Sequence, residues 1–558
     1  MVFIFVVNRM ISIVVVGMIF SILVIMQRIT TSELASHNTA SSCWIAMDGV
    51  VYDVTKFLRS HPGGSQVIVA SSGRDVTEEF FSFHKKEVLA KYGPKFQVGV
   101  LESSATQLDH LGVGSEFDTY TPFAETPFIR GWKSPYMSDS HKRMRLAVRQ
   151  FVDKHILPDL EFMHERGEDP SEELFDLMGK HGIIACRVGK SAMPFVKNPL
   201  PGNVGPKEFN YFHQLVAVQE LYRIGSGGVS DGLGVGATIG LPPVIYFGTD
   251  TLKRRIVPEV LSGKVRACLA ITEPVAGSDV ANIAMTANET SDGKSYIVNG
   301  LKKWITGSGT KFPSVYSALV RTGGPGHKGL SMMLIEDPKD SSQGTITKHR
   351  IKTSYSGAAG TALLEFDNVI VPKENLLGQE GQGFMLSMAN FNGERLYLCM
   401  VGSAFARTAV AECYRWAMQR KAFGKRLIDQ PVIRYKLAEM SAMVECLDAW
   451  LEQLTFQMDT MGPMEQFEKL SSPIALMKFH FGRCGWKIAD QACQIFGGRA
   501  VTRTGMGRLI EAFKNEAKFT AITGGSEEVI ADLAVRQAVA QCDRLKKSSK
   551  EAIIMSRL

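Results

Sequence analysis

The sequence lacks several features that mark particular classes of protein. Its nine cysteines form no Cys-x-x-Cys pair and their number is odd, which argues against a zinc ribbon or a disulfide scaffold and favours a reducing compartment. No block of lysine and arginine is present, and 63 basic against 56 acidic residues leave a net charge of only +7, so no nucleic-acid footprint is expected. With 45% hydrophobic and 21% charged residues, neither a disordered chain nor a polytopic membrane protein fits.

Only one long hydrophobic run stands out, and it lies near the N-terminus. Residues 11–26 carry no charge. As a helix they would span about 24 Å, so they need the apolar residues before them to cross a bilayer core of about 30 Å. We interpret residues 1–27 as a membrane anchor with a transmembrane helix. A signal peptide fits less well because no A-x-A-like cleavage site follows, and a misassigned start codon is a further alternative.

The last three residues, Ser556-Arg557-Leu558, differ from the peroxisomal address S-K-L only by Arg in place of Lys. A peroxisomal matrix address and a membrane anchor are not easily combined in one protein. The expected location is therefore membrane-associated or peroxisomal, and both alternatives stay open.

Residues 28–102 contain two histidines that suit an iron porphyrin. His61 belongs to a His-Pro-Gly-Gly turn, and His84 follows 23 residues later, after a Gly-Arg-Asp-Val-Thr-Glu-Glu-Phe run. Imidazole is an axial ligand of haem iron, and two of them leave no position for oxygen, which predicts one-electron transfer. The pair Asp48-Gly49 between two β-rich runs also predicts a hairpin.

Taken together, these motifs resemble cytochrome b5 domains over about residues 30–101. The resemblance implies that His61 and His84 are the metal ligands, holding the iron of haem b. Ser72 departs from the family, which usually has Ala before the Gly. Residues 103–137 contain three prolines and little periodicity. They are therefore predicted to be a semi-rigid linker, which would let the haem domain swing over the larger domain that follows.

The remainder changes from helical to β-rich patterns and back. We expect a helical domain over 138–264, a β domain over 265–380, a helical domain over 381–545 and a tail over 546–558, with Ser138 among the first N-cap candidates. In the β region, Thr272 precedes an Ala-Gly-Ser-Asp loop rich in hydrogen-bond donors. Trp304 and Thr306 occupy alternate strand positions and so should share one face of a sheet, which suits an isoalloxazine ring.

Three later motifs complete the pattern: Arg-Lys-Ala-Phe-Gly-Lys at 420–425, Gln-Ile-Phe-Gly-Gly-Arg at 494–499 and Ile-Thr-Gly-Gly-Ser-Glu-Glu-Val at 522–529. With the motifs at 271–280 and 302–307, they resemble the acyl-CoA dehydrogenase family over about residues 138–545. The resemblance implies a multi-domain α+β protein. Its parts would be the cytochrome b5-like α+β module and an acyl-CoA dehydrogenase fold with a helical domain, a β-barrel-like middle domain and a C-terminal four-helix bundle, with FAD as cofactor.

The same resemblance implies roles for individual residues. The residues expected to bind FAD are Thr272, Ser278, Trp304, Thr306, Arg420, Phe423, Gln494, Gly498, Ser526 and Glu528. Arg420, Phe423, Gln494 and Gly498 resemble residues that contact the FAD of a neighbouring subunit, which implies a homo-oligomer, either a dimer or a tetramer. Ala422 stands where Thr is frequent, so one hydrogen bond to FAD is in doubt.

The reaction needs a carboxylate that removes a weakly acidic α-proton beside a thioester. Most members of the family place this Glu just before the adenosine contacts, where the present chain has Gly524. A Glu directly before an Arg, here Glu394 before Arg395, is the arrangement found in the isovaleryl-CoA and long-chain branches of the family. We therefore expect Glu394 to be the catalytic base. Arg395 is expected to orient the site around the substrate, and Ser278 is also expected to contact the substrate. Glu528 and its neighbour Glu527 are alternatives further from the α-carbon.

The expected function is an FAD-dependent acyl-CoA dehydrogenase that makes a trans-2-enoyl-CoA, as in fatty acid β-oxidation, with the haem domain as electron relay. An electron acceptor protein or oxygen would complete turnover. Two alternatives stay open: a superfamily oxidase that uses oxygen, and a membrane-tethered haem electron carrier whose acyl-CoA- and FAD-binding part does not turn over.

Overall fold

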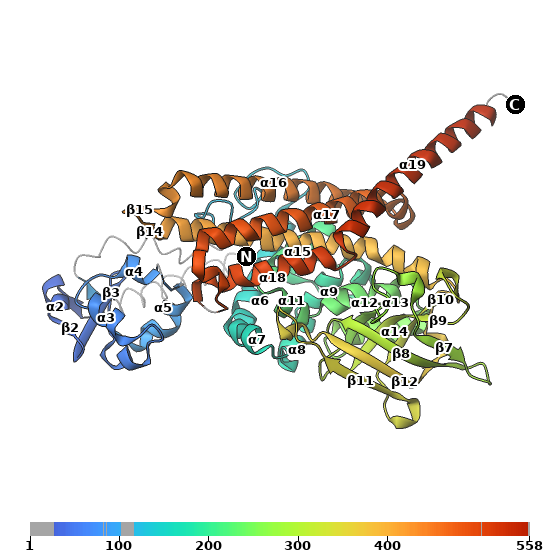
Figure 1. Ribbon diagram of the computed structural model, residues 1–558, viewed down its shortest axis with the longest axis horizontal. Coiled ribbons are helices and arrows are strands. Elements are labelled where there is room, and N and C mark those ends of the chain that lie inside the picture. Colours follow the sequence, from blue (N-terminus) through green and yellow to red (C-terminus); the bar gives the residue numbers. More distant parts are fainter. Residues whose placement is uncertain (1–26, 82, 85, 102–116, 504, 556–558) are drawn as a thin grey trace, which may run out of the picture. The chain divides into compact units, whose positions relative to one another are not determined.

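The computed structural model describes residues 27–81, 83–84, 86–101, 117–503 and 505–555 (Figure 1). They form two compact units. The first extends to Asp118 and includes Trp416–Leu427, and the second comprises Thr119–Arg415 and Ile428–Leu558. The predicted anchor, apart from its last residue, and the terminal tripeptide lie outside the described residues. The expectations for the two ends of the chain therefore remain predictions.

The first unit contains a five-stranded sheet with the order β1-β5-β4-β3-β2. Asp48 and Gly49 join β3 to β4, and their positive φ values of 49° and 75° match the type I′ hairpin expected of this pair. The predicted hairpin is thus confirmed. The elements are β1 (Arg28–Ile29), α2 (Thr31–Ser36), β2 (Asn38–Thr39), β3 (Ser42–Met47), β4 (Val50–Asp53), α3 (Ser65–Ser71), α4 (Thr77–Phe81), α5 (Lys86–Tyr92) and β5 (Gln97–Leu101).

Helices form the first part of the second unit. Ser138 is the N-cap of the first of them, as predicted, and its backbone N–H donates to Nδ1 of His141 at 2.9 Å. Such a bond satisfies a donor that helix geometry leaves unpaired. The helices are α6 (Asp139–His155), α7 (Leu160–Arg166), α8 (Glu172–Lys180), α9 (Ile183–Val188), α10 (Tyr211–Tyr222), α11 (Gly227–Gly232), α12 (Val235–Gly240), α13 (Pro242–Phe247) and α14 (Asp250–Leu261).

Residues 119–137, which we call the docking segment, pack on these helices although they were expected to be linker. Glu125 is buried and accepts hydrogen bonds of 2.6 and 3.2 Å from the Arg149 guanidinium of α6. The Arg407 guanidinium donates to the backbone oxygens of Phe123 (3.1 Å) and Glu125 (3.3 Å). Because a carboxylate is buried only when it is paired, the docking segment is part of the second unit. Its proline content alone did not reveal this.

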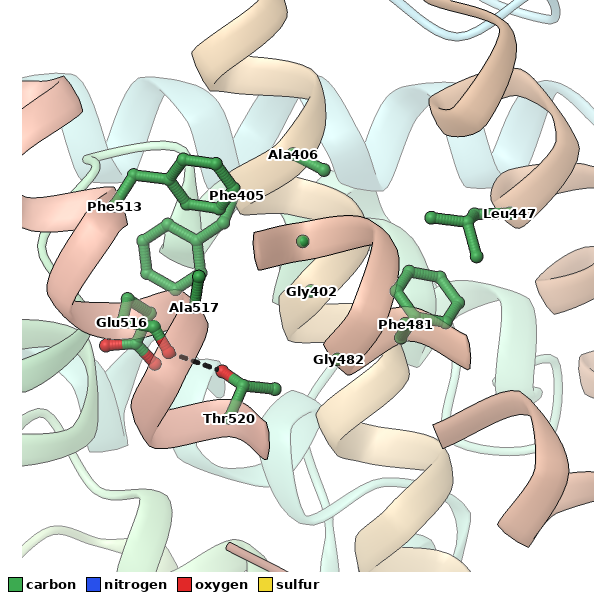
Figure 2. Close-up of a pocket in the computed structure, with 11 residues that line it drawn as sticks. Gly402, Phe405, Ala406, Leu447, Phe481, Gly482, Phe513, Glu516, Ala517 and Thr520 are labelled. Atoms are coloured by element: carbon green, nitrogen blue, oxygen red, sulfur yellow. Dashed lines mark hydrogen bonds between the residues drawn. The ribbon is translucent and has the colours of Figure 1, made fainter. Parts of the chain in front are cut away.

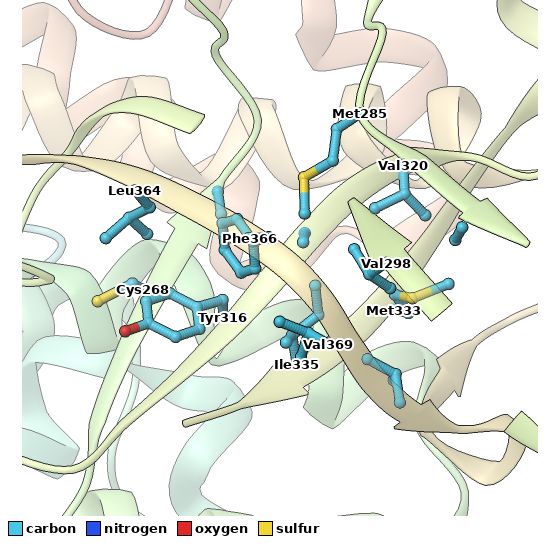
Figure 3. Packing of buried hydrophobic residues seen from close by; sticks show 14 of the residues in the cluster. Cys268, Met285, Val298, Tyr316, Val320, Met333, Ile335, Leu364, Phe366 and Val369 are labelled. Atoms are coloured by element: carbon cyan, nitrogen blue, oxygen red, sulfur yellow. The ribbon is translucent and has the colours of Figure 1, made fainter. Parts of the chain in front are cut away.

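An eight-stranded sheet follows, in the order β11-β12-β8-β7-β9-β10-β13, with β6 beside β9. Figure 3 shows part of its core, in which Tyr316 lies beside Phe366 and Met333 beside Val298. Alternate residues of β8 such as Tyr296 and Val298 are buried, as strand periodicity requires. The strands are β6 (Arg266–Ala270), β7 (Thr286–Glu289), β8 (Ser295–Ile305), β9 (Ser314–Arg321), β10 (Leu330–Glu336), β11 (Thr345–Arg350), β12 (Ala362–Pro372) and β13 (Leu376–Leu377).

Long helices complete the chain, so the expected multi-domain α+β fold is confirmed. They are α15 (Gly383–Gln419), α16 (Pro431–Thr460), α17 (Pro463–Phe496), α18 (Arg508–Ile522) and α19 (Glu527–Met555), with a short hairpin of β14 (Lys421–Ala422) and β15 (Lys425–Arg426) after α15. Pro431 and Pro463 stand at first helical positions, where the missing N–H costs nothing. In the described part of the chain, α15 alone is long and apolar enough to cross a membrane, yet 78% of its apolar window is buried inside the protein.

Candidate functional site

His61 and His84 face each other in the first unit. Their ring centroids are 6.0 Å apart, about the distance that an iron bonded to one nitrogen of each ring at about 2 Å requires. Nδ1 of His61 pairs with the Gly64 carbonyl oxygen (3.1 Å) and Nδ1 of His84 with that of Phe80 (3.2 Å). With the proton on Nδ1, each Nε2 is the ligating atom. Burial lowers the pKa of His84, which favours the neutral, metal-binding imidazole. The residues present therefore fit a bis-histidine haem.

The His-Pro-Gly-Gly turn explains how His61 is positioned. The 3₁₀ helix Thr55–Ser60 ends at His61, which has an extended backbone because Pro62 disfavours helical geometry before it. A Cβ on Gly63 would lie 2.8 Å from Cε1 of His61, and Gly64 has a φ of 85°. Side chains at either glycine would therefore displace the ring or strain the turn.

In the second unit, a buried ion pair holds the loop at 271–280. Lys302 Nζ, with no exposed surface, donates to Glu273 Oε1 at 2.8 Å and to the backbone oxygens of Ile271 and Leu319 at 2.9 and 2.6 Å. The Glu273 carboxylate in turn accepts from the backbone N–H groups of residues 284–285 at 2.7 and 3.0 Å. All three ammonium protons of Lys302 are used, so the loop has a fully paired anchor.

Trp304 stands in a bulge near the end of β8. Lys302 pairs with Leu364 and Ile305 with Ala362, so two residues of β8 oppose one of β12. Trp304 has a φ of 66° and its side chain is 53% exposed, while its neighbour Ile305 is buried. The bulge interrupts the alternation between Lys302 and Ile305, both of which are buried. The bulge turns the indole away from the core, and a positive φ at such a bulky residue is a strained conformation typical of functional sites.

Thr306 follows the end of β8 and is half-buried. Tyr355, which lies near it, pairs through its hydroxyl with Thr361 at 3.2 Å and stacks its ring on Phe519 at 4.1 Å. Trp304 and Thr306 thus both lie off the buried face of the strand, on which Ile305 is buried. No motif in the sequence pointed to Tyr355, because it comes from an irregular loop.

The other predicted flavin contacts lie on loops and helix ends: Thr272 and Ser278 on the loop after β6, Gln494 and Gly498 at the end of α17, and Ser526 and Glu528 at the start of α19. The Lys303 N–H donates to the Thr272 carbonyl oxygen at 2.8 Å, which brings the loop beside Trp304. Arg420 and Phe423 belong to the β14–β15 hairpin, where Phe423 is 96% exposed with a φ of 54°. An aromatic ring this exposed is typical of a contact surface.

Glu394 lies on α15 with a carboxylate oxygen, Oε2, that is shielded from solvent and has no hydrogen-bond partner. Burial raises the pKa of Glu394 to about 7, and the charges of Arg395 and Lys478 oppose this rise. A shielded carboxyl without a hydrogen bond that titrates near neutral pH is well suited to accept a proton from carbon. Gly524, whose φ is 66°, accepts a hydrogen bond from Arg395 Nε at 3.1 Å.

The alternative carboxylates are less suited to this role. Glu527 forms an ion pair with Arg483 at 3.2 Å, and Glu528 is exposed to water. Asp231 is buried but accepts a hydrogen bond of 2.7 Å from Tyr222. None of these three combines shielding with an unpaired oxygen.

Glu516 is another buried carboxyl, and its Oε2 has no partner. Figure 2 shows it beside Thr520 at a small cavity that is otherwise lined mainly by glycines and apolar side chains such as Phe405 and Phe481. Gly402 of α15 also lines this cavity, eight residues and about 12 Å of helix beyond Glu394. The cavity therefore belongs to the interior of the helical bundle and not to the surroundings of Glu394.

Comparison with protein families gives four matches. Residues 30–102 match the cytochrome b5-like haem/steroid binding domain. Residues 138–264, 268–369 and 381–539 match the N-terminal, middle and C-terminal domains of acyl-CoA dehydrogenase. Together, these matches follow the order of motifs along the chain.

Individual proteins give the same picture. The acyl-CoA dehydrogenase apdG of Emericella nidulans is 38% identical over 75% of this chain and 95% of its own length. The acyl-CoA dehydrogenase AFT10-1 of Alternaria alternata is 34% identical over 77% and 98%. Among solved structures, butyryl-CoA dehydrogenase from Megasphaera elsdenii has a TM-score of 0.64 at 24% identity, covering 73% of this chain and all of that one. At this identity the likeness concerns the fold.

Proposed function

The chain belongs to the acyl-CoA dehydrogenase family and carries a cytochrome b5-like domain, and we propose that it oxidises an acyl-CoA to the trans-2-enoyl-CoA and passes the electrons to its own haem. Dehydrogenation is supported by apdG and AFT10-1, both named acyl-CoA dehydrogenases. The observation that carries the proposal is the shielded, unpaired Oε2 of Glu394, whose neighbour Arg395 donates a hydrogen bond to the backbone oxygen of Gly524.

In the proposed reaction, Glu394 takes the α-proton of the thioester onto a carboxylate oxygen. The electron pair left at the α-carbon forms the double bond as a hydride leaves the β-carbon. FAD, when bound, supplies the acceptor for that hydride. Arg395 holds the backbone of Gly524 in place through its hydrogen bond. The position of Glu394 relative to the turn at Gly524 is therefore fixed.

Several residues of this chain suit FAD. Trp304 offers an exposed aromatic face, and Thr306 offers a hydroxyl directly after the end of β8. Backbone and side-chain donors of Thr272 and Ser278 would hold the ring edge and the pyrophosphate. Ser526 and Glu528 are the proposed remaining contacts within the subunit, and Gln494 and Gly498 would contact the FAD of a neighbouring subunit, as the family resemblance implies.

We further propose that the protein is a homo-oligomer. Phe423 is 96% exposed, and the long helices also leave Trp486 (49%), Val535 (62%) and Val539 (56%) in water. Exposed apolar side chains on a hairpin tip and on outer helix faces are the kind of surface that a second copy would cover. Phe423 and Arg420 would then contact the FAD of the neighbouring subunit.

The haem relay is proposed because the two redox groups differ in electron count. Dehydrogenation releases two electrons at once, whereas haem iron takes one at a time. A covalently attached acceptor has an effective concentration of roughly millimolar for a short flexible tether. Bis-histidine ligation by His61 and His84 leaves the iron no site for oxygen, so electron transfer is the chemistry that remains.

Anaerobic titration of the purified holoprotein with acyl-CoAs of several chain lengths tests the proposal. Flavin bleaching followed by the reduced haem bands is the expected result. Bleaching with an oxidised haem would contradict the relay and direct attention to oxygen or an external acceptor. If no acyl-CoA bleaches the flavin, the protein is a haem carrier with a non-catalytic binding domain.

His84→Ala should abolish the haem absorbance while leaving flavin bleaching by acyl-CoA within about twofold of the wild-type rate. The loss follows because one axial ligand is removed from a bis-histidine site. Haem content by absorbance and bleaching by stopped flow are the two measurements. His37→Ala is the matched control, since this histidine lies in the same unit and pairs with Ser42 at 2.6 Å. A variant that keeps full haem content would contradict the ligand assignment.

A further inference from the structure

Two buried cations hold residues 521–525, which we call the glycine turn. Lys478 of α17 is 1% exposed, and its Nζ donates to the backbone oxygens of Gly525 (2.7 Å) and Ala521 (3.2 Å). Arg395 of α15 donates to the backbone oxygen between them, that of Gly524. The end of a helix leaves carbonyl groups without intrahelical partners, and here charged donors from two other helices satisfy them.

Glu394 lies close enough to both cations for their charges to lower its pKa, yet neither donates a hydrogen bond to it. A buried ammonium needs negative charge nearby. Lys478 also interacts with Glu527 of α19 and with the thiol of Cys399 on α15. Glu527 is already paired with Arg483, and burial raises the pKa of Cys399, which keeps its thiol neutral. Glu394 is therefore, with Glu527, one of the two carboxylates whose charge acts on Lys478.

Resting on the proposed function, we propose that Lys478 is a positioning residue of the reaction, which fixes the glycine turn and supplies a positive charge to the catalytic carboxylate. The turn has no side chain at Gly524, and a Cβ there would lie 2.6 Å from Leu398 Cδ1. Backbone hydrogen bonds must therefore hold what side-chain packing cannot. Charge without hydrogen bonding leaves both oxygens of Glu394 able to accept the proton.

The charge has a defined effect on the pH dependence of proton removal. Burial raises the pKa of Glu394 to about 7, with Lys478 and Arg395 acting in the opposite direction. Burial also lowers the pKa of Lys478 to about 8, so at pH 7 the lysine is charged. Removing that charge favours the protonated form of Glu394, and its pKa should rise. A lysine that served only as a helix cap would not change this titration.

The experiment compares Lys478→Met and Lys478→Arg in the FAD-loaded full chain. A 3-thia-acyl-CoA is the probe, because its α-proton can leave but the sulfur at the β-position has no hydride to give. Deprotonation next to oxidised flavin gives a long-wavelength charge-transfer band, and its pH midpoint reports the base. We expect the midpoint to rise by about one pH unit in Lys478→Met and to return toward the wild-type value in Lys478→Arg. Lys487→Met is the control on the same helix, where Lys487 pairs with Glu439 at the surface.

Amide hydrogen exchange gives a second measurement that needs no substrate. Lys478→Met should exchange faster in residues 521–526 than the wild type or Lys487→Met, because two hydrogen bonds to the glycine turn are lost. An unchanged pH midpoint, or unchanged exchange in this turn, overturns the proposal. A wild-type protein that forms no band at any pH contradicts the proposed function instead, and the exchange comparison then still decides whether Lys478 holds the turn.

Discussion

Glu394→Gln is expected to slow flavin bleaching by acyl-CoA about a thousandfold or more. Gln has nearly the same shape but cannot take a proton from carbon, and general bases contribute about 10²- to 10⁴-fold to such steps. The wild-type rate should rise with pH through about 7, because burial raises the pKa of Glu394 to about 7 and only the carboxylate is active. Stopped-flow bleaching between pH 5.5 and 8.5 measures both effects.

The same substitution should stabilise the protein at high pH. The pKa of Glu394 is raised from its usual value of 4.5 to about 7 in the folded chain, so folding disfavours ionisation. Wild-type stability is then complete below about pH 4.5 and is lost as the pH rises through 7. Glu394→Gln removes this loss, about 3 kcal/mol at pH 8. Urea unfolding of both proteins at pH 5 and pH 8 should show the gap widening with pH.

Glu439→Gln serves as the control for both measurements, since Glu439 pairs with Lys487 at the surface. It should change neither the bleaching rate nor the pH dependence of stability. A Glu394→Gln protein that bleaches at more than a tenth of the wild-type rate would show that the base is elsewhere. Asp231 and Glu516 would then be the buried carboxyls to examine.

Lys302→Met should destabilise the protein by about 3–5 kcal/mol. Removing one partner of a buried ion pair leaves the other charge uncompensated, and the Glu273 carboxylate would remain buried at 4% exposure. The loop at 271–280 would also lose the anchor that holds Thr272 beside Trp304. We therefore expect both a lower urea midpoint and a lower FAD content after purification.

Lys373→Met is the matched control for this prediction. Lys373, which follows β12, pairs with Glu289 at the end of β7 at 2.5 Å, but both side chains are more than 40% exposed. Such surface pairs contribute about 0–1 kcal/mol. Adding Glu273→Gln to Lys302→Met should recover part of the stability, because the buried charge is then gone and one backbone N–H keeps an acceptor. Equal effects of Lys302→Met and Lys373→Met would contradict the buried-pair interpretation.

Features that depend on neighbouring residues were predictable from the sequence. The Asp48–Gly49 hairpin and the Ser138 N-cap each rest on a few consecutive residues, whose backbone preferences decide the local structure. The bulge at Trp304 was not predictable in this way. It depends on how β8 pairs with β12, and the bulge arises between Ala362 and Leu364, almost 60 residues further along the chain.

Charged residues show the same limit. Lys302 and Lys303 are adjacent and indistinguishable by pattern, yet only Lys302 is fully buried, because Glu273 and two carbonyl groups surround its ammonium. Glu125 stands in a proline-containing stretch that resembles a spacer, and its partner Arg149 lies 24 residues away. The roles assigned to the cofactor contacts stay predictions of the family resemblance, which the titrations above can test.

Because the docking segment packs on the second unit, it should stay with that unit when the catalytic part is exchanged between proteins. A fragment cut at Ser138, where the family match begins, would take Glu125 away from Arg149 and uncover the guanidinium of Arg407. A fragment that starts at Thr119 keeps these contacts. Recombination between chains of this kind should therefore be tolerated before residue 119, and the catalytic module should be inherited together with residues 119–137.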